Sequence, residues 1–199
     1  MSVIAAALLL ASCGGRFVSP AAVVDGGKIS QADVQAELDL LATEPQFAAA
    51  LHGPQADQGR RDLAREALAA LISERIATEY AGAHGITIGP QDVSAALRRV
   101  IAQLGGQAAF QRLLKARGLT LDQARELVRQ QVLFGKVEDA VAAQRLGSAA
   151  GSATRQQKDA AFNKWMAGRL AHADIQVNPR FGRFDPGTGQ IHQVHSTAS

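Results

Sequence analysis

The sequence predicts a mostly α-helical fold, a multi-helix body closed by a small β-ribbon that pairs the first and last strands. Three observations lead to this prediction. The 199 residues are 47% hydrophobic but only 5% aromatic, a composition that favours closely packed helices over a sandwich or barrel. Apolar residues recur at intervals of three and four along most of the chain, as on one helix face. Only two short segments, near residues 23 and 175, have the pattern of strands.

The chain should begin its fold with a β-hairpin and a capped helix. Val23 and Val24 precede an Asp-Gly-Gly turn at 25–27. Ser30, with Asp33 three residues later, predicts the start of a helix. The apolar side of that helix is expected to carry Val34, Leu38, Leu41 and Ala42.

A looser segment and a long helix should follow. Residues 44–59 contain two prolines. Phe47 and Leu51 are expected to anchor this segment to the rest of the protein. Residues 61–83 then show an apolar stripe at helical spacing. Its members are Leu68, Leu71, Ile72, Ile76 and Tyr80.

The segment 85–93 predicts an elbow between two helices. Gly85 suits a left-handed C-cap, and residues 86–88 are β-branched and suit an extended piece. Gly89 is an expected N-cap, with Pro90 at the first helical position. The next helix has a stripe formed by Val93, Ala96, Leu97, Val100, Ile101 and Leu104.

Glycines and hydroxyl caps divide the second half of the chain. Residues 105–106 should break one helix, Gly118 should end a short amphipathic helix, and Thr120 should cap a helix that runs to about residue 146. Residues 147–153 are small and predict a linker. A last helix, with its apolar positions between residues 162 and 170, precedes an alternating strand at 173–179, and residues 186–199 predict a flexible tail.

The two strands are expected to pair with each other. A lone strand at Val23 and Val24 would leave backbone groups unpaired. The segment from Ile175 to Val177 is the best partner that the sequence offers. The first and last elements should therefore meet.

The N-terminus has the pattern of a lipoprotein signal. An apolar run at residues 3–10 leads into Leu10, Ala11, Ser12 and Cys13, which resembles the lipobox of bacterial lipoproteins. The resemblance implies a signal peptide at 1–12, acylation of Cys13 with palmitate-type chains, and a lipidated tether at 13–21. The alternative is a buried helix with an incidental thiol, and no basic residue precedes the apolar run. A lipidated Cys13 would place the protein on the extracytoplasmic face of a cell membrane.

Charge and hydropathy argue against two classes of partner. The net charge is only +3, and the arginines interleave with acidic residues, so no nucleic-acid-binding stripe is expected. No apolar stretch of about 18 residues exists that would predict a membrane span.

Taken in order, these elements resemble the SurA N-terminal domain family of extracytoplasmic chaperones. The resemblance spans residues 22–185, which we expect to form one domain. It is carried by the hairpin and capped helix at 22–34, the elbow with Asp92, the glycine breaks near 105 and 118, Trp165, and the segment 173–182. In several relatives a parvulin-type prolyl isomerase domain precedes the closing helix, where this chain has only residues 147–153. Seven small residues cannot form such a domain, so isomerase activity is not expected.

The residues themselves predict no catalytic, metal or cofactor site. His192 and His195 lie in a polar segment without a neighbouring carboxylate cluster, and His84 next to Gly85 suits a helix end. Together with the resemblance, this favours a chaperone-like protein that holds unfolded or extended polypeptides. The alternatives are an envelope scaffold with one fixed partner and, less favoured, a prolyl isomerase. Neither client identity nor oligomeric state is indicated.

An extended peptide would need apolar contacts and backbone hydrogen bonds more than particular side chains. The candidate contacts are aromatic or aliphatic residues on amphipathic segments. The alternative for each is ordinary core packing. These candidates are Phe47, Leu51, Phe110, Leu114 and Phe134.

Overall fold

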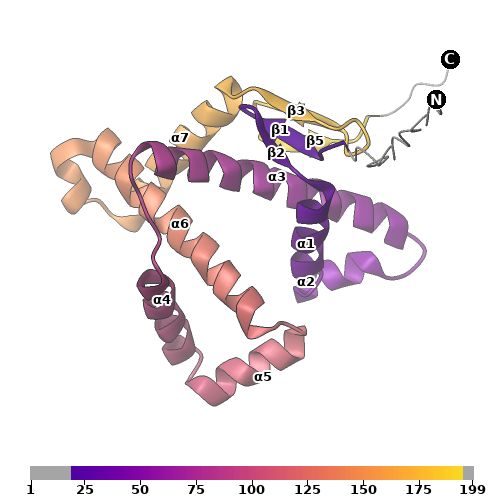
Figure 1. Ribbon diagram of the computed structural model, residues 1–199, viewed down its shortest axis with the longest axis horizontal. Coiled ribbons are helices and arrows are strands. Elements are labelled where there is room, and N and C mark those ends of the chain that lie inside the picture. Colours follow the sequence, from indigo (N-terminus) through magenta and orange to yellow (C-terminus); the bar gives the residue numbers. More distant parts are fainter. Residues whose placement is uncertain (1–18, 195–199) are drawn as a thin grey trace, which may run out of the picture.

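The computed structural model describes residues 19–194, which form a helical body with two small antiparallel sheets. Figure 1 shows the long helix α3 crossing the molecule, with the other helices arranged around it. The elements in chain order are β1 (Ala22–Val24), β2 (Gly27–Ile29), α1 (Gln31–Leu41), α2 (Pro45–Ala48), η1 (Ala49–Leu51), α3 (Ala56–Ala83), α4 (Pro90–Gln103), α5 (Gln107–Arg117), α6 (Leu121–Leu146), η2 (Gly147–Gly151), α7 (Arg155–His172), β3 (Ile175–Val177), β4 (Arg183–Asp185) and β5 (Gln190–His192).

The predicted β-ribbon between the two ends of the domain is confirmed. The strand order is β2-β1-β3, and the central strand β1 pairs antiparallel with both neighbours. Asp25 (φ 45°) and Gly26 (φ 84°) form the two-residue turn, which needs left-handed backbone at both positions. Asp25 also joins the hairpin to β3, since its N–H donates to the Asp174 carbonyl and its carboxylate accepts from the Asp174 N–H.

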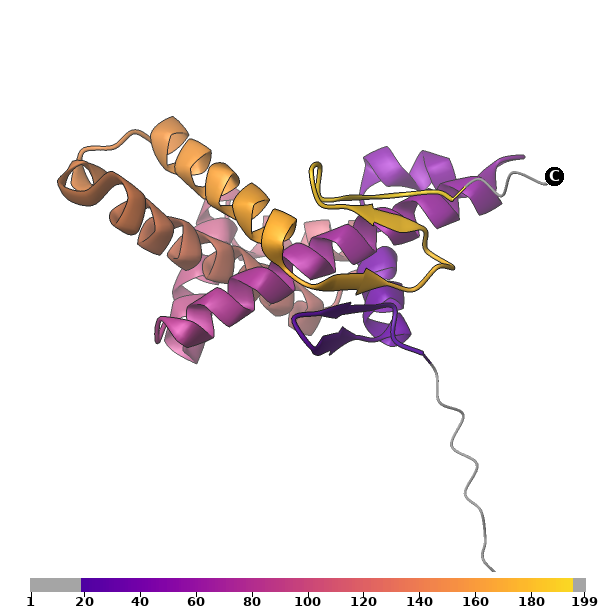
Figure 2. The ribbon, with the colours of Figure 1, turned by 90° about the horizontal axis from the view of Figure 1, so that it is seen from above.

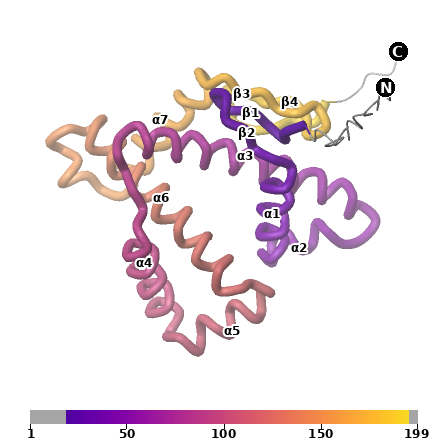
Figure 3. The backbone as a smooth tube through the Cα atoms, viewed as in Figure 1, coloured from indigo at the N-terminus to yellow at the C-terminus, as the bar shows by residue number. Residues whose placement is uncertain are grey.

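Helix α3 is the centre of the core because it contacts α1, α6, α7 and the strands. Leu68, Ile72 and Ile76 follow one another at spacing four and are all fully buried. Val137 and Val141 of α6 and Val24 of β1 complete the set of most deeply buried large side chains. The tube in Figure 3 follows α3 from the strands to the point where α6 and α7 pack against it.

The elbow between α3 and α4 has the predicted caps and one unpredicted tie. Gly85 has a left-handed φ of 66°, and Gly89 N–H donates to the Asp92 carboxylate at 2.9 Å. Lys136 of α6 reaches both the Asp92 carboxylate (2.8 Å) and the Thr87 carbonyl (2.9 Å). The elbow is therefore held against α6 by one lysine.

Helices α4 and α5 form an arm that is less buried than the rest of the body. Helix α4 packs against α6, but none of the side chains in its predicted apolar stripe is fully buried, and Leu104 is 38% exposed. Seen from above in Figure 2, the hairpin of α6 and α7 projects from one end of the body, with the strands toward the other end.

Four predicted segments differ from the structure. Helix α3 begins at Ala56 rather than near 61, and the looser segment before it contains α2 and η1. The small residues after α6 form η2 rather than an irregular linker.

The prediction for the C-terminal segment is wrong. A flexible tail was predicted from residue 186, but residues 183–192 form the β4–β5 hairpin. Ile191 is only 7% exposed and joins the core, while Asp185 accepts hydrogen bonds from Gly187 and Thr188 in the turn. Residues 195–199 lie outside the described range.

Within residues 19–194, no helix combines the length and hydropathy needed to cross a membrane.

Candidate functional site

The surface where α1, α3 and α6 converge contains two adjoining cavities, which we call the α1–α3–α6 groove. One cavity of about 390 Å³ also borders β2, and the other, of about 230 Å³, borders the elbow after α3. Glu74, Thr78, Glu126 and Gln130 line both. Gln130 donates to the Glu74 carboxylate at 3.1 Å, so this hydrogen bond crosses the groove between the two cavities.

The groove combines apolar side chains with polar ones. Leu71 and Ile29 contribute apolar surface in the larger cavity, and Ile86, Ile88 and Leu133 do so in the smaller. The α3 residues at 71, 74, 75, 78, 81 and 82 fall on one face because helical neighbours are three and four apart. Such a mixed lining suits a polypeptide, which presents both apolar side chains and backbone groups.

Two glutamates of the groove are partly desolvated. Burial raises the pKa of Glu37 and is also the main cause of the raised pKa of Glu74. The neighbouring carboxylates of Glu37 and Glu126 raise the pKa of Glu74 further, whereas the Gln130 hydrogen bond lowers it. Lys28, Arg75 and Arg129 line the same groove, so both signs of charge are present.

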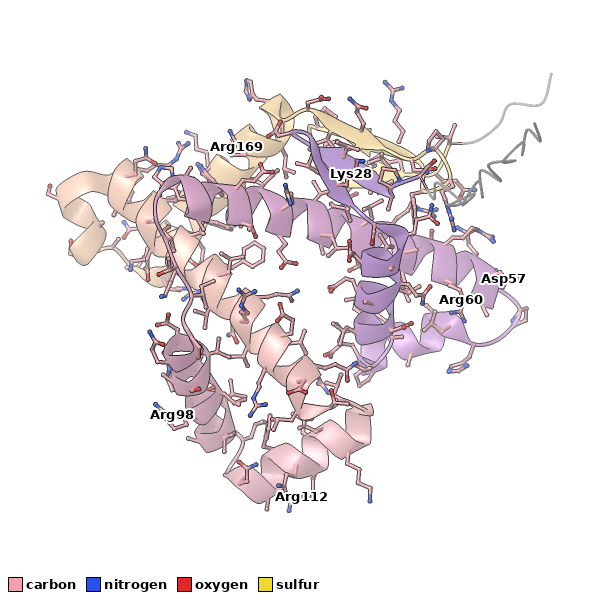
Figure 4. The ribbon with its side chains drawn as sticks, viewed as in Figure 1. Lys28, Asp57, Arg60, Arg98, Arg112 and Arg169 are labelled. Atoms are coloured by element: carbon pink, nitrogen blue, oxygen red, sulfur yellow. The ribbon has the colours of Figure 1, made fainter. Side chains whose placement is uncertain are left out.

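The larger cavity runs beside the outer edge of β2. Within the sheet this strand pairs only with β1, and Lys28 and Ile29 line the cavity. Ile29 turns its carbonyl toward β1, where it accepts from Ala21 N–H at 2.8 Å. Because alternate strand residues point their backbone groups in opposite directions, the N–H and C=O of Lys28 point away from β1. Figure 4 shows Lys28 on this strand.

A third cavity, of about 790 Å³, lies between the end of α3, α6 and α7. Its wall contains an aromatic group in which His84 stacks on Tyr80 (ring centroids 3.8 Å apart) and Tyr80 meets Trp165 edge-on (4.9 Å). The Tyr80 hydroxyl donates to Gln144 at 3.3 Å, and Trp165 is only 6% exposed. These contacts fasten the end of α3 to α6 and α7.

The five predicted peptide contacts do not share one surface. Phe47 and Leu51 lie on α2 and η1, Phe110 and Leu114 on α5, and Phe134 in the middle of α6, and none of them lines the cavities described above. Phe110 is 3% exposed, so it is a packing residue and not an open contact. The other four are half-buried, and Phe134 packs edge-on against Phe162. As peptide contacts, these four stay predictions.

Sequence reasoning missed the groove residues Glu37, Glu74 and Gln130. They are polar residues on amphipathic helices, a pattern that also describes any solvated helix face. Their position on a shared concave surface depends on the crossing of α1, α3 and α6. Ile86 and Ile88 were noted only as extended residues of the elbow.

Two further candidates lie partly or wholly beyond the described residues. Cys13 falls outside them, so its lipidation stays a prediction. His192 lies in β5 at 3.6 Å from the Asp185 carboxylate, whereas His195 is outside the described range. Among residues 19–194, no cluster of three or more His, Cys, Asp or Glu side chains is placed to hold a metal ion.

Comparison with known proteins identifies the family. A model of the SurA-like N-terminal domain matches residues 1–138, from the N-terminus into α6. No curated protein matches the sequence. The matched part includes β1, β2, the helices α1 to α5 and residues 121–138 of α6, so every residue that lines the groove lies within it. The chain therefore belongs to the family of SurA-like N-terminal domains.

Proposed function

We propose that this protein holds extended segments of unfolded polypeptides in the α1–α3–α6 groove without catalysing a reaction, and that a lipid on Cys13 keeps it at the extracytoplasmic face of a membrane. Family membership supports a chaperone-related role. The observation that carries the proposal is the groove itself, with apolar side chains along a concave surface beside the outer edge of β2.

The proposed binding combines two weak interactions. A client strand would hydrogen-bond to the outward backbone groups of Lys28, as in strand addition to a sheet edge. Its apolar side chains would then contact Leu71 and, farther along, Ile86 and Ile88. With only a three-residue edge and no deep apolar pocket, binding should be reversible and tolerant of sequence, as holding many clients requires.

The test is suppression of client aggregation, followed by light scattering. The double variant Leu71→Asp/Ile88→Asp places charges on the apolar surface of both cavities and should reduce suppression at least several-fold. Leu127→Asp is the matched control, because Leu127 is 37% exposed on α6 and does not line the groove. Circular dichroism verifies that each variant is folded. Equal suppression by the wild type and a folded double variant would contradict the proposed site.

A docking role with one fixed partner is the second candidate, and one observation favours it. Three of the four exposed large hydrophobic residues found within residues 19–194 lie on the α4 and α5 arm or at the start of α6. These residues are Leu104, Leu121 and Leu127.

A pulldown from envelope extract separates the two functions. A single partner in stoichiometric amount, lost in Leu104→Asp/Leu121→Asp, would favour docking, whereas a diverse set of clients would favour holding. Prolyl isomerase activity would have to appear as faster refolding of a proline-limited substrate.

A further inference from the structure

A cavity of about 290 Å³ between α1, the first turns of α3 and the segment after β3 has a strongly basic lining. Four arginines surround it, and no carboxylate is among the residues that line it. Its apolar side is formed by Val34, Leu38, Ala64 and Phe181, and the arginines are Arg60, Arg61, Arg65 and Arg180. We call this the four-arginine cavity.

Most of this positive charge is not neutralised by neighbouring side chains. Among the ion pairs of residues 19–194, only Arg65 of the four has a carboxylate partner, Asp62. Arg61 donates to the side-chain oxygen of Gln58, a neutral group. Arg60 lies in the first turns of α3. Figure 4 labels it near the exposed Asp57.

Arg180 is held in place by neutral contacts. It donates to the Gln31 side-chain oxygen at 2.5 Å, and its guanidinium lies 5.1 Å from the centre of the Phe181 ring. Arg65, on α3, has a side chain that is only 11% exposed. Two of the four cations are thus positioned before any ligand binds, which lowers the entropy cost of binding an anion.

The cavity lies next to the start of the described chain. Gln31, which accepts from Arg180, also donates from its amide to the Ser19 carbonyl at 2.8 Å. Cys13 is six residues before Ser19, and six extended residues span at most about 20 Å. A lipid on Cys13 would therefore hold the rim of the cavity close to the headgroups of the bilayer.

We propose that the four-arginine cavity binds the phosphate of anionic phospholipid headgroups and so fixes the orientation of the domain on the membrane. The guanidinium group matches phosphate geometry and donates two parallel hydrogen bonds to it. A basic patch beside an acyl anchor supplies the second signal that stable attachment needs. This inference rests on the proposed lipid anchor, because the anchor is what brings the cavity close to the membrane. The preference of the cavity for phosphate depends only on its arginines.

The experiment uses the full chain carrying Cys13→Ser, so that no acyl chain contributes. It is sedimented with vesicles of phosphatidylcholine alone and with vesicles of phosphatidylcholine and phosphatidylglycerol in equal parts. We expect preferential binding to the mixed vesicles, weakened by added salt. Arg60→Gln/Arg61→Gln should reduce that binding about 25-fold, since each arginine near an anionic surface contributes about a factor of five.

The matched control removes the same charge elsewhere. Arg98→Gln/Arg112→Gln alters exposed residues of α4 and α5 that do not line the cavity and lie away from Arg60 in Figure 4, and it should retain the preference for mixed vesicles. An equal loss in both double variants, or equal binding to the two vesicle types, would overturn the proposal. So would thermal stabilisation by inorganic phosphate without binding to vesicles, because the ligand would then be a soluble phosphate.

The two proposals can fail separately. Aggregation suppression by Arg60→Gln/Arg61→Gln should equal that of the wild type, since neither arginine lines the α1–α3–α6 groove. If the Cys13→Ser protein with all four arginines suppresses aggregation but shows no preference for the mixed vesicles, only the headgroup site is contradicted. If it prefers the mixed vesicles but does not suppress aggregation, only the chaperone function is contradicted.

Discussion

Arg117, the last residue of α5, forms an ion pair with Glu44, which precedes α2 and lies 73 residues earlier in the chain. The Nη1–Oε1 distance is 2.5 Å, and both side chains are about one-third exposed. This pair ties the C-terminal end of α5 to the segment after α1. The helices around the groove are thereby joined at the end opposite the elbow.

Breaking this pair should loosen the arm more than it destabilises the protein. For Arg117→Met we expect a loss of about 0.5 kcal/mol in the free energy of unfolding, because partly exposed pairs contribute little. Hydrogen exchange of the α5 amides should nevertheless accelerate, since α5 has few other contacts. Arg125→Met, which removes a pair internal to α6, is the control and should leave α5 exchange unchanged. Unchanged exchange in Arg117→Met would show that the pair does not hold the arm.

The elbow depends on Lys136. Lys136→Met should lower the free energy of unfolding by about 1 kcal/mol, because the Thr87 carbonyl loses its side-chain donor and the Asp92 carboxylate keeps only the Gly89 N–H. Urea denaturation gives the value. Lys158→Met is the control, because it removes a pair between α7 and α6 at the same 2.8 Å distance but without a backbone acceptor. A larger loss in the control would mean that the elbow tie is unimportant.

Asp92 should make stability depend on acid pH. The Lys136 and Gly89 hydrogen bonds hold its pKa below 3.8. A depressed carboxyl pKa stabilises the fold above the unfolded value and loses that contribution as pH falls through the folded value. Thermal midpoints should therefore fall less steeply below about pH 4 in Asp92→Asn than in the wild type. Parallel curves for the two proteins in that range would contradict this assignment.

Glu74 should have the opposite effect. Its pKa is raised above 4.5, mainly by burial, so the folded protein binds its proton more readily than the unfolded chain does. Stability then decreases as pH rises from the unfolded pKa through the folded one. Glu74→Gln should raise the thermal midpoint at pH 7. A stabilisation of about 1 kcal/mol would raise it by about 2–4 °C in a protein of this size, and we expect less because the side chain is only half-buried. The gain should vanish below about pH 4.5, and a gain that is constant with pH would exclude desolvation as its cause.

The centre of α3 should tolerate little change. Ile72 is fully buried, and Ile72→Ala should lower the free energy of unfolding by about 2–5 kcal/mol through lost burial and the cavity left behind. Leu121→Ala, at a side chain that is 41% exposed, should cost under about 1 kcal/mol. Chemical denaturation of both variants provides the comparison. Similar losses at the two sites would mean that α3 is not the core helix.

The proposed anchor has its own test. Cys13→Ser should abolish incorporation of labelled fatty acid and release the protein from the membrane fraction. Retained labelling would show that a residue other than Cys13 is acylated and that the lipobox prediction is wrong. Cys13 is the only cysteine of the chain, so no second thiol can replace it.

The sequence predicted the parts of the fold that local chemistry determines. Gly85, Gly89 and Pro90 marked the elbow because caps need particular residues, and β1 required a partner that only the segment around Ile175 could supply. The β4–β5 hairpin was missed because the three residues of β4 include a single apolar one, Phe184. The groove was missed because Glu37, Glu74 and Gln130 come from three helices and meet only through tertiary packing.

The β-ribbon also sets the order in which the protein can mature. Strand β1 lies between β2 and β3, yet β3 is about 150 residues later in the chain. Until β3 has been synthesised, β1 has one neighbour and an open edge. Contacts between distant residues form slowly because a long loop must close first. Until its last elements appear, the chain thus carries a strand with one unpaired edge, the same hazard that the clients proposed for it would face.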